Sequence, residues 1–296
     1  MKIVQSLWSK PGNPEFIGGI ENHNKCGWAD KRFNYFSWAL SVNQLLKYYN
    51  QVELITDKKG YDLLINRLEL PYTSVRVVLD NLNGYHHKLW ALGKLYAYSL
   101  QEEPFMHVDG DVYIWEKFDD SLENGELLCQ NREEGNFYNA YYRQIFLPIA
   151  SNFNYYPKSI DNSLGKHQKF KAINAGVMGG QNLVFFKEYT AKAFEFVDRN
   201  MEFIEETSSA FNMIYEQLLF RSMADEQGID ISYFYSDTAP PYFFDFMGIP
   251  NHTKYIHVSG SSKKESFLTE CLEYRLRRDY PEFYYRILRL LKKNII

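Results

Sequence analysis

Short apolar runs alternate with longer segments of helical periodicity through the first 115 residues, and this alternation limits the possible folds more than any other feature. The apolar runs have the length and β-branched content of buried strands. They lie at 2–8, 52–57, 74–80 and 104–108. Helical segments separate them, at 32–50, 58–68 and 86–100. Strand, helix, strand in repetition predicts an α/β fold with a mainly parallel, Rossmann-like central sheet flanked by helices.

The second half of the sequence is less regular but still consists of strand and helix patterns. We expect further strands at 125–130, 170–180, 230–235 and 254–260. We expect helices at 182–205 and 209–226, a polar and aromatic loop at 151–168, and a glycine-rich turn at the end of 170–180. Two helical stretches close the chain. No linker or repeat divides it, so the sequence predicts one domain, 1–265, with a C-terminal helical extension, 266–296.

Composition excludes several classes of protein. Lysine and arginine total 33 against 37 aspartate and glutamate, a net charge of −4, and this balance argues against a nucleic-acid-binding protein. The three cysteines are far apart and match neither a zinc motif nor a disulfide framework. No run of about 18 apolar residues occurs, and the first residues lack a signal-peptide core. We therefore expect a cytoplasmic protein.

The segment FMHVDGDVYIW, residues 105–115, places two carboxylates directly after an apolar run. In parallel sheets, ligands bind beyond the carboxyl ends of the strands. Asp109 and Asp111 flank Gly110, where the backbone can bend so that both carboxylates address one small volume. Two like charges so close are stabilised by a cation, and hard oxygen ligands suit Mg²⁺ or Mn²⁺. The alternative is a solvated turn, since Asp-Gly is a common turn dipeptide.

Three motifs, taken in order, resemble a known family. They are the Asp-x-Asp at 109–111, NAGVMGG at 174–180 and HVSGSSKK at 257–264. Together they resemble nucleotide-sugar glycosyltransferases of the GT-A fold, and in particular the retaining group that includes glycogenin and bacterial lipopolysaccharide galactosyltransferases. The resemblance covers about residues 1–265 at the level of fold pattern. The sequence also looks like a bacterial family without an assigned function.

The resemblance implies a metal and donor site. Asp109, Asp111 and His257 would hold Mn²⁺ or Mg²⁺, whose preferred partners include diphosphate oxygens. A second set of residues would contact the nucleotide-sugar donor: Trp8, Asp57, Lys88, Gly176, Gly260 and Lys263. Trp8 and Asp57 lie at the ends of the first two predicted strands, where base and ribose would lie. The alternatives are that His257 has a structural role, that Trp8 belongs to the core, and that Lys88 is an ordinary solvated lysine.

The resemblance also implies catalytic positions, and here the sequence departs from the pattern. Asn174 would hydrogen-bond sugar hydroxyls, or else cap a turn through its amide. The group usually has Asp-Gln-Asp in the following helix, whereas this sequence has Glu216 and Gln217. Three interpretations stay open: Gln217 fills the polar position of a retaining enzyme, Glu216 is the base of an inverting one, or both are exposed on a surface helix.

The resemblance implies a function: transfer of a sugar from a UDP-linked donor to a glycan, lipid-linked or peptide acceptor. Two alternative functions stay open. A nucleotidyltransferase that forms sugar nucleotides should have a glycine-rich basic loop after the first strand, where this sequence has one glycine and one lysine in SLWSKPGNPEF. A non-catalytic carbohydrate-binding protein could use the 24 tyrosines and 22 phenylalanines to stack sugars.

The C-terminal helix is basic and has apolar residues at helical spacing: Phe283, Ile287, Leu290 and Leu291. This pattern predicts peripheral contact with the inner face of a membrane. The alternative is that the helix closes the core of the domain.

Overall fold

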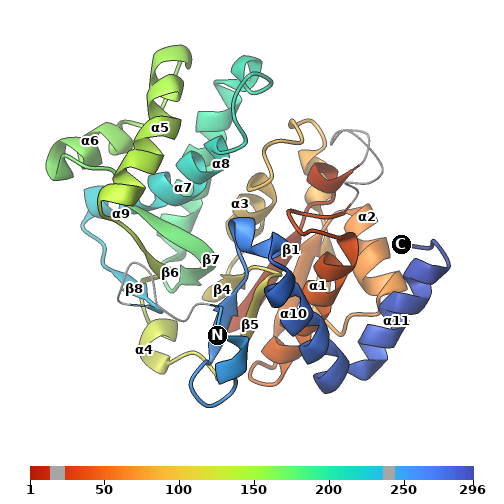
Figure 1. The fold of residues 1–296 in the computed structure, drawn as a ribbon. Coiled ribbons are helices and arrows are strands. Elements are labelled where there is room, and N and C mark those ends of the chain that lie inside the picture. The colour runs from red at the N-terminus through yellow and green to blue at the C-terminus, as the bar shows by residue number, and fades with distance from the viewer. Residues whose placement is uncertain (14–23, 236–243) are drawn as a thin grey trace. The chain divides into compact units, whose positions relative to one another are not determined.

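The computed structural model describes residues 1–13, 24–235 and 244–296, and the chain forms two compact units (Figure 1). Unit 1 comprises residues 1–81, 108–117 and 241–296, and unit 2 comprises residues 82–107 and 118–240. Residues 14–23 and 236–243 lie outside the described residues.

Unit 1 has a parallel sheet and a small antiparallel one. The parallel strands lie in the order β3 (Ser74–Val77), β2 (Val52–Thr56), β1 (Lys2–Leu7). All five residues of β2 are buried, as expected for a strand covered on both faces. Strands β5 (Val112–Ile114) and β9 (Tyr255–His257) form the antiparallel pair.

The helices of unit 1 pack against each other. They are α1 (Lys31–Leu46), α2 (Lys58–Tyr61) with a π-helix (Asp62–Arg67), α10 (Ser266–Asp279) and α11 (Pro281–Lys292). Short 3₁₀ turns lie at Lys10–Gly12, Leu79–Leu82, Phe246–Gly248 and Gly260–Lys264. Helix α1 is buried on most sides and is contacted by both α10 and α11, so these C-terminal helices are part of the core of unit 1.

Unit 2 has a mixed sheet in the order β4, β7, β6, β8. Its strands are β4 (Phe105–Val108), β6 (Leu127–Glu133), β7 (Ala172–Gly180) and β8 (Ile231–Tyr233). Strand β6 runs antiparallel to β7 and parallel to β8. Gly179 lies in β7 where a Cβ atom would come within 2.1 Å of the Phe105 carbonyl oxygen, so only glycine permits this close approach.

The helices of unit 2 include one π-helical segment. They are α3 (Leu92–Ser99), α4 (Asp120–Glu123), α5 (Asn136–Asn152), α6 (Lys158–His167), α7 (Leu183–Asp198), a 3₁₀ turn (Met201–Phe203), α8 (Phe211–Met213), the π-helix η6 (Ile214–Leu218) and α9 (Leu219–Gln227). Helix α6 contacts α9, and α7 contacts α3 (Figure 1).

The predicted α/β class, with mainly parallel strands flanked by helices and two C-terminal helices, is confirmed. Two local predictions are wrong. The segment 151–168 is not a loop throughout, because Lys158–His167 forms helix α6, which buries Ser159, Ile160 and Ser163. The glycines at the end of 170–180 form no turn but continue β7, since close strand packing requires them there. The boundary at residue 265 stays a prediction, and α10 begins at Ser266.

Candidate functional site

The turn that carries Asp109 and Asp111 is held by side chains beneath it. Ser37 of α1 donates a hydrogen bond to the Gly110 carbonyl at 2.7 Å. Gln5 of β1 donates to the Asp109 carbonyl at 3.3 Å. The turn is closed by the Val112 amide, which donates to the same Asp109 carbonyl at 3.1 Å. The backbone of the turn is therefore held in place through its carbonyl groups.

Gly110 is required by packing in this turn. A Cβ atom there would lie 2.7–2.8 Å from the indole ring of Trp38, a buried residue of α1. We expect Gly110→Ala to lower the free energy of unfolding by about 1–3 kcal/mol, since the indole must move to admit the methyl group. Urea denaturation would measure this. Gly84→Ala is the control because its Cβ would meet nothing within 4 Å; equal losses in both variants would refute the packing argument.

The pairing of β5 with β9 adds a histidine to the two carboxylates. Val112 lies opposite His257 in the register, and the Val258 amide donates to the Asp111 carbonyl at 3.0 Å. One ligand atom each of Asp109, Asp111 and His257 lies within 4.8 Å of the others. We call these three residues the metal-ligand group. His257 is 4% exposed, and both aspartates are half-buried.

Lys263 extends from the 3₁₀ turn Gly260–Lys264 to the metal-ligand group. Its Nζ atom lies 2.6 Å from Oδ2 of Asp111, and His257 Nε2 lies 3.4 Å from Oδ1 of the same carboxylate. Burial by itself raises the pKa of Asp111, but the Lys263 charge, followed by His257, outweighs burial and holds this pKa below its usual range. Asp111 is therefore ionised at neutral pH.

The donor set fits a divalent cation. Two carboxylates and an imidazole offer hard oxygen atoms and one nitrogen, a combination suited to Mn²⁺ and acceptable to Mg²⁺ with water completing the shell. Lys263 would lie beside such an ion, where its ammonium group can meet an anionic ligand of the metal. The predicted grouping of Asp109, Asp111, His257 and Lys263 in one place agrees with this geometry.

The other predicted donor residues of unit 1 have defined structural surroundings. Trp8 and Asp57 directly follow β1 and β2, as expected, and both are buried. Asp57 caps α2, where its Oδ1 accepts from the Gly60 amide at 2.7 Å and its Oδ2 accepts from Ser9. Gly260 adopts φ +57°, a left-handed conformation that suits glycine.

In unit 2, Asn174 lies within β7 rather than in a turn. Its Nδ2 donates to Glu133 Oε1 at 3.1 Å, and its Oδ1 accepts from the amide of Gly176 at 3.0 Å. Asn174 therefore links the last residue of β6 to the backbone of β7. Lys88 precedes α3 and donates to the Glu205 carbonyl, and the Asn212 amide holds the Lys88 carbonyl at 2.7 Å.

Glu216 and Gln217 both lie in the π-helix η6, and the interpretation of an exposed surface pair is wrong. Glu216 is fully buried and Gln217 is 8% exposed. The two side chains have different partners, because Glu216 pairs with Lys94 at 2.8 Å while Gln217 Oε1 lies 2.8 Å from the Tyr142 hydroxyl. A π-helix inserts one residue per turn and is frequent at functional sites.

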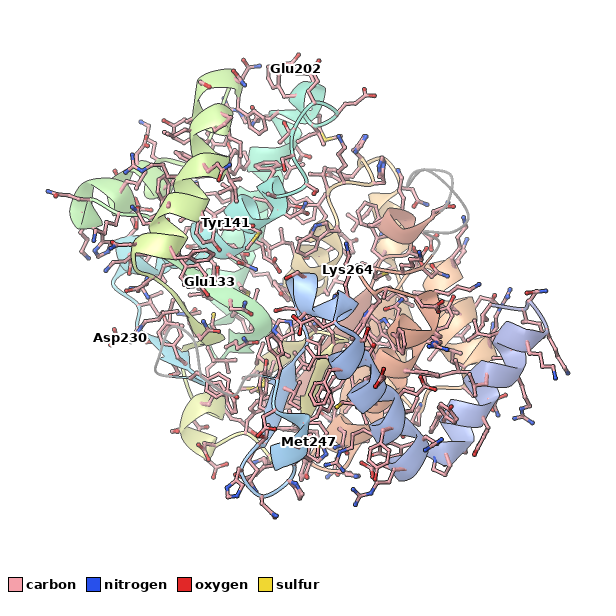
Figure 2. All side chains as sticks on the ribbon, viewed as in Figure 1. Glu133, Tyr141, Glu202, Asp230, Met247 and Lys264 are labelled. Carbon is pink, nitrogen blue, oxygen red and sulfur yellow. The ribbon has the colours of Figure 1, made fainter. Side chains whose placement is uncertain are left out.

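Tyr142 connects Gln217 to a carboxylate that the sequence analysis missed. Its hydroxyl donates to Glu133 Oε2 at 2.5 Å, and Glu133 is 5% exposed at the end of β6. We call Glu133, Tyr142, Asn174 and Gln217 the polar cluster; Figure 2 labels Glu133 together with the neighbouring Tyr141 of α5. The missed signal is a Glu after an apolar run, GELLCQNREEG, followed by the aromatic segment NFYNAYY.

His107 of β4 also belongs to unit 2 and gives a test in pH. Burial, followed by the charge of Lys94, holds the pKa of His107 well below its ordinary value. The folded imidazole thus stays neutral where the unfolded one, with a pKa of about 6.5, binds a proton. Stability is therefore lost as the pH falls below about 6.5, at about 1.4 kcal/mol per pH unit until the folded pKa is reached. Urea midpoints between pH 7 and about pH 5 should fall less steeply in His107→Gln; parallel slopes would contradict this.

The fold and the metal-ligand group define an α/β protein with a candidate divalent-cation site at the turn before β5. Residues 1–290 match the family described as "Family of unknown function (DUF6734)", and the chain belongs to this family. A search of curated proteins finds no match.

Solved structures similar to this chain include three glycosyltransferases. For the glycosyltransferase GlyE of Streptococcus pneumoniae TIGR4, the identity is 11% and the TM-score 0.45, over 99% of this chain and 64% of that one. For galactosyltransferase LgtC in complex with donor and acceptor sugar analogues, the identity is 12% and the TM-score 0.45, over 93% of this chain and 96% of that one. For apo mouse xyloside xylosyltransferase 1, the identity is 9% and the TM-score 0.39, over 86% of this chain and 96% of that one. This chain thus spans less than two thirds of the GlyE structure.

Within the described ranges 1–13, 24–235 and 244–296, no helix combines the length and hydropathy required to cross a bilayer.

Proposed function

We propose that this protein is a metal-dependent glycosyltransferase of GT-A fold that moves a sugar from a UDP-linked donor to an acceptor hydroxyl. The observation that carries the proposal is the metal-ligand group, Asp109, Asp111 and His257, with the Lys263 ammonium 2.6 Å from Asp111. Two carboxylates around one position need a cation, and a cation beside a lysine suits a diphosphate. A bound divalent ion would supply Lewis-acid stabilisation of the leaving diphosphate.

The residues of the chain would divide the remaining tasks. Asp109, Asp111 and His257 hold the ion, and Lys263 supplies a point charge to the phosphate oxygens. Gly260, whose conformation leaves its Cα face open, lets backbone N–H groups approach the same oxygens. Trp8, Asp57, Lys88 and Gly176 stay proposed donor contacts.

For the stereochemistry, we propose retention with Gln217 as the polar group at the reacting face. Gln217 is neutral and linked through Tyr142 to Glu133, whereas Glu216 is already engaged by Lys94. An inverting enzyme needs a base, and a carboxylate paired with a buried lysine is a poor one. Asn174 would orient a sugar hydroxyl. Proton NMR of the first-formed product gives the anomeric configuration; inversion, with loss of transfer in Glu216→Gln, would overturn the assignment.

Donor hydrolysis with a panel of nucleotide sugars tests the activity itself. We expect release of free sugar from one UDP-linked donor in the presence of Mn²⁺, and loss of this release with EDTA. A carbohydrate-binding protein without catalytic activity would bind sugar but release none. A nucleotidyltransferase would instead form a sugar nucleotide from a nucleoside triphosphate and a sugar phosphate. Either result would refute the proposal.

The membrane contact of α11 is a separate part of the proposal. Tyr284 and Ile287 are buried in unit 1, with Tyr284 packed 5.3 Å from the ring of Phe36, so Ile287 is not free to enter a bilayer as the sequence had suggested. The exposed basic residues Arg289, Lys292 and Lys293 remain for anionic lipid.

Such binding must be electrostatic. We expect the full chain to sediment with phosphatidylglycerol vesicles at low salt, and a variant with Arg289, Lys292 and Lys293 changed to glutamate to stay in solution. Failure of the unmodified chain to sediment would remove the membrane from the proposal.

A further inference from the structure

Two large aromatic side chains are exposed on the outer face of helix α10 (Figure 1). Phe267 is 59% exposed and Tyr274 is 53% exposed, although the opposite side of the helix buries leucines in unit 1. At 100° per residue, four side chains fall within about 60° of one another around the helix axis: Phe267, Cys271, Tyr274 and Arg278. We call these four residues the α10 stripe. Aromatic rings grouped on one exposed face are typical of a surface that binds a partner.

The α10 stripe has the spacing of a surface on which helices pair. Its residues are separated by four, three and four positions, which is the alternation of d and a positions in a coiled coil. The stripe extends over about 17 Å of the helix axis. Cys271 is half-buried and lies between the two exposed rings, so an aromatic ring of a second helix can pack over its small side chain.

Two exposed charges flank the α10 stripe on one side. Glu270 and Arg277 are seven positions apart, so they lie within about 20° of each other around the axis, next to Tyr274. In an antiparallel pair about a two-fold axis, this side of one helix meets the same side of the other with its direction reversed. Glu270 of one copy then lies beside Arg277 of the second copy, and the converse pair forms as well. The charges of this face therefore complement those of a second copy.

The same reversal gives the α10 stripe complementary neighbours. If Cys271 lies opposite Tyr274 of the second copy, Phe267 lies opposite Arg278 of that copy. A guanidinium group over an aromatic ring is a favourable contact, and a small thiol leaves room for the tyrosine. An anionic membrane fits this face less well, because it would repel the exposed Glu270. The face as a whole favours another copy of this chain.

We propose that α10 forms a homodimer interface, in which the α10 stripes of two copies pack antiparallel about a two-fold axis and Glu270 of each copy pairs with Arg277 of the other. One helix pair of this length buries less than the roughly 1,000 Å² that a strong interface requires, so the dimer is weak, with a Kd of about 10–100 µM.

Sedimentation equilibrium of the full chain and of two charge-reversal variants tests this interface. Glu270→Arg and Arg277→Glu should each weaken dimerisation by about tenfold or more, because each variant places like charges opposite each other at both ends of the helix pair. An equimolar mixture of the two variants should dimerise again, since each variant supplies the charge that the other lacks. Both positions are exposed, so the substitutions leave the core of unit 1 intact.

The aromatic part of the interface has its own matched control. Tyr274→Ala should weaken dimerisation by about tenfold or more, whereas Tyr285→Ala should leave it unchanged, because Tyr285 is 57% exposed but lies on α11. Three results would overturn the proposal: an unmodified chain that stays monomeric up to about 300 µM, a mixture of the two charge variants that does not dimerise, or equal effects of the two tyrosine variants. A monomeric chain that loses binding to phosphatidylglycerol vesicles in Tyr274→Ala would assign this face to a membrane instead.

Discussion

Asp109→Asn and Asp111→Asn should each weaken Mn²⁺-dependent binding of UDP by about 100-fold or more, with the chain still folded. Each substitution keeps the side-chain shape but removes one of the two negative charges that would face the ion. His257→Ala should have a smaller effect, since a water molecule can replace a neutral ligand more readily than a charged one. Isothermal calorimetry with UDP in the presence and absence of Mn²⁺ measures all three variants.

Lys263 provides the control for this experiment. The ammonium group of Lys263 lies 2.6 Å from Asp111, so Lys263→Met should raise the affinity for Mn²⁺ alone, because a competing cation is removed. The same substitution should lower the affinity for UDP, because a positive charge near the phosphates is lost. Opposite changes in the affinities for Mn²⁺ and for UDP are expected only where the lysine lies beside both the ion and the diphosphate. UDP binding by the Asp109 and Asp111 variants at the affinity of the unmodified chain would refute the metal site.

Lys94→Met should destabilise the protein by about 3–5 kcal/mol, because it removes the ammonium group that lies 2.8 Å from the carboxylate of the fully buried Glu216. The Lys94 ammonium also donates to the Ala175 carbonyl at 3.1 Å, so the pair joins α3, η6 and the backbone of β7. Urea denaturation at neutral pH measures the loss. A change below about 1 kcal/mol would show that the ion pair contributes little to stability.

The double variant Lys94→Met, Glu216→Gln is the matched control, since it removes both charges. We expect it to recover most of the stability, because two neutral groups need no mutual compensation. Its transfer activity then separates the two roles of Glu216. If the double variant keeps its transfer activity, Glu216 has a structural role and Gln217 remains the proposed polar group at the reacting face. Lost transfer in a stable double variant would assign Glu216 to the reaction.

The metal-ligand group could be predicted from the sequence, but the polar cluster could not. Asp109 and Asp111 follow an apolar run, so strand position indicated a ligand site, with a solvated turn as the alternative. The motifs that carry the resemblance favoured the metal and added His257. Glu133 also ends a strand, yet nothing local showed that Tyr142 and Asn174 would meet it. The prediction of a loop at 151–168 was wrong because α6 buries only Ser159, Ile160 and Ser163, so its sequence has no apolar periodicity of the kind that indicates a helix.

Local periodicity by itself determined the α/β class, the strands that directly precede Trp8, Asp57 and Asp109, and the helical character of the C-terminus, because these features repeat over a few residues. Tertiary structure decided what those elements contact. The pairing of β5 with β9 brought His257 to Asp111, and packing within unit 2 brought Lys94 of α3 to Glu216 of η6. Such contacts join residues far apart in sequence and depend on register and burial, which no local pattern encodes. The sequence left open whether Glu216 and Gln217 are exposed, whereas in the structure both are buried and have different partners, Lys94 and Tyr142.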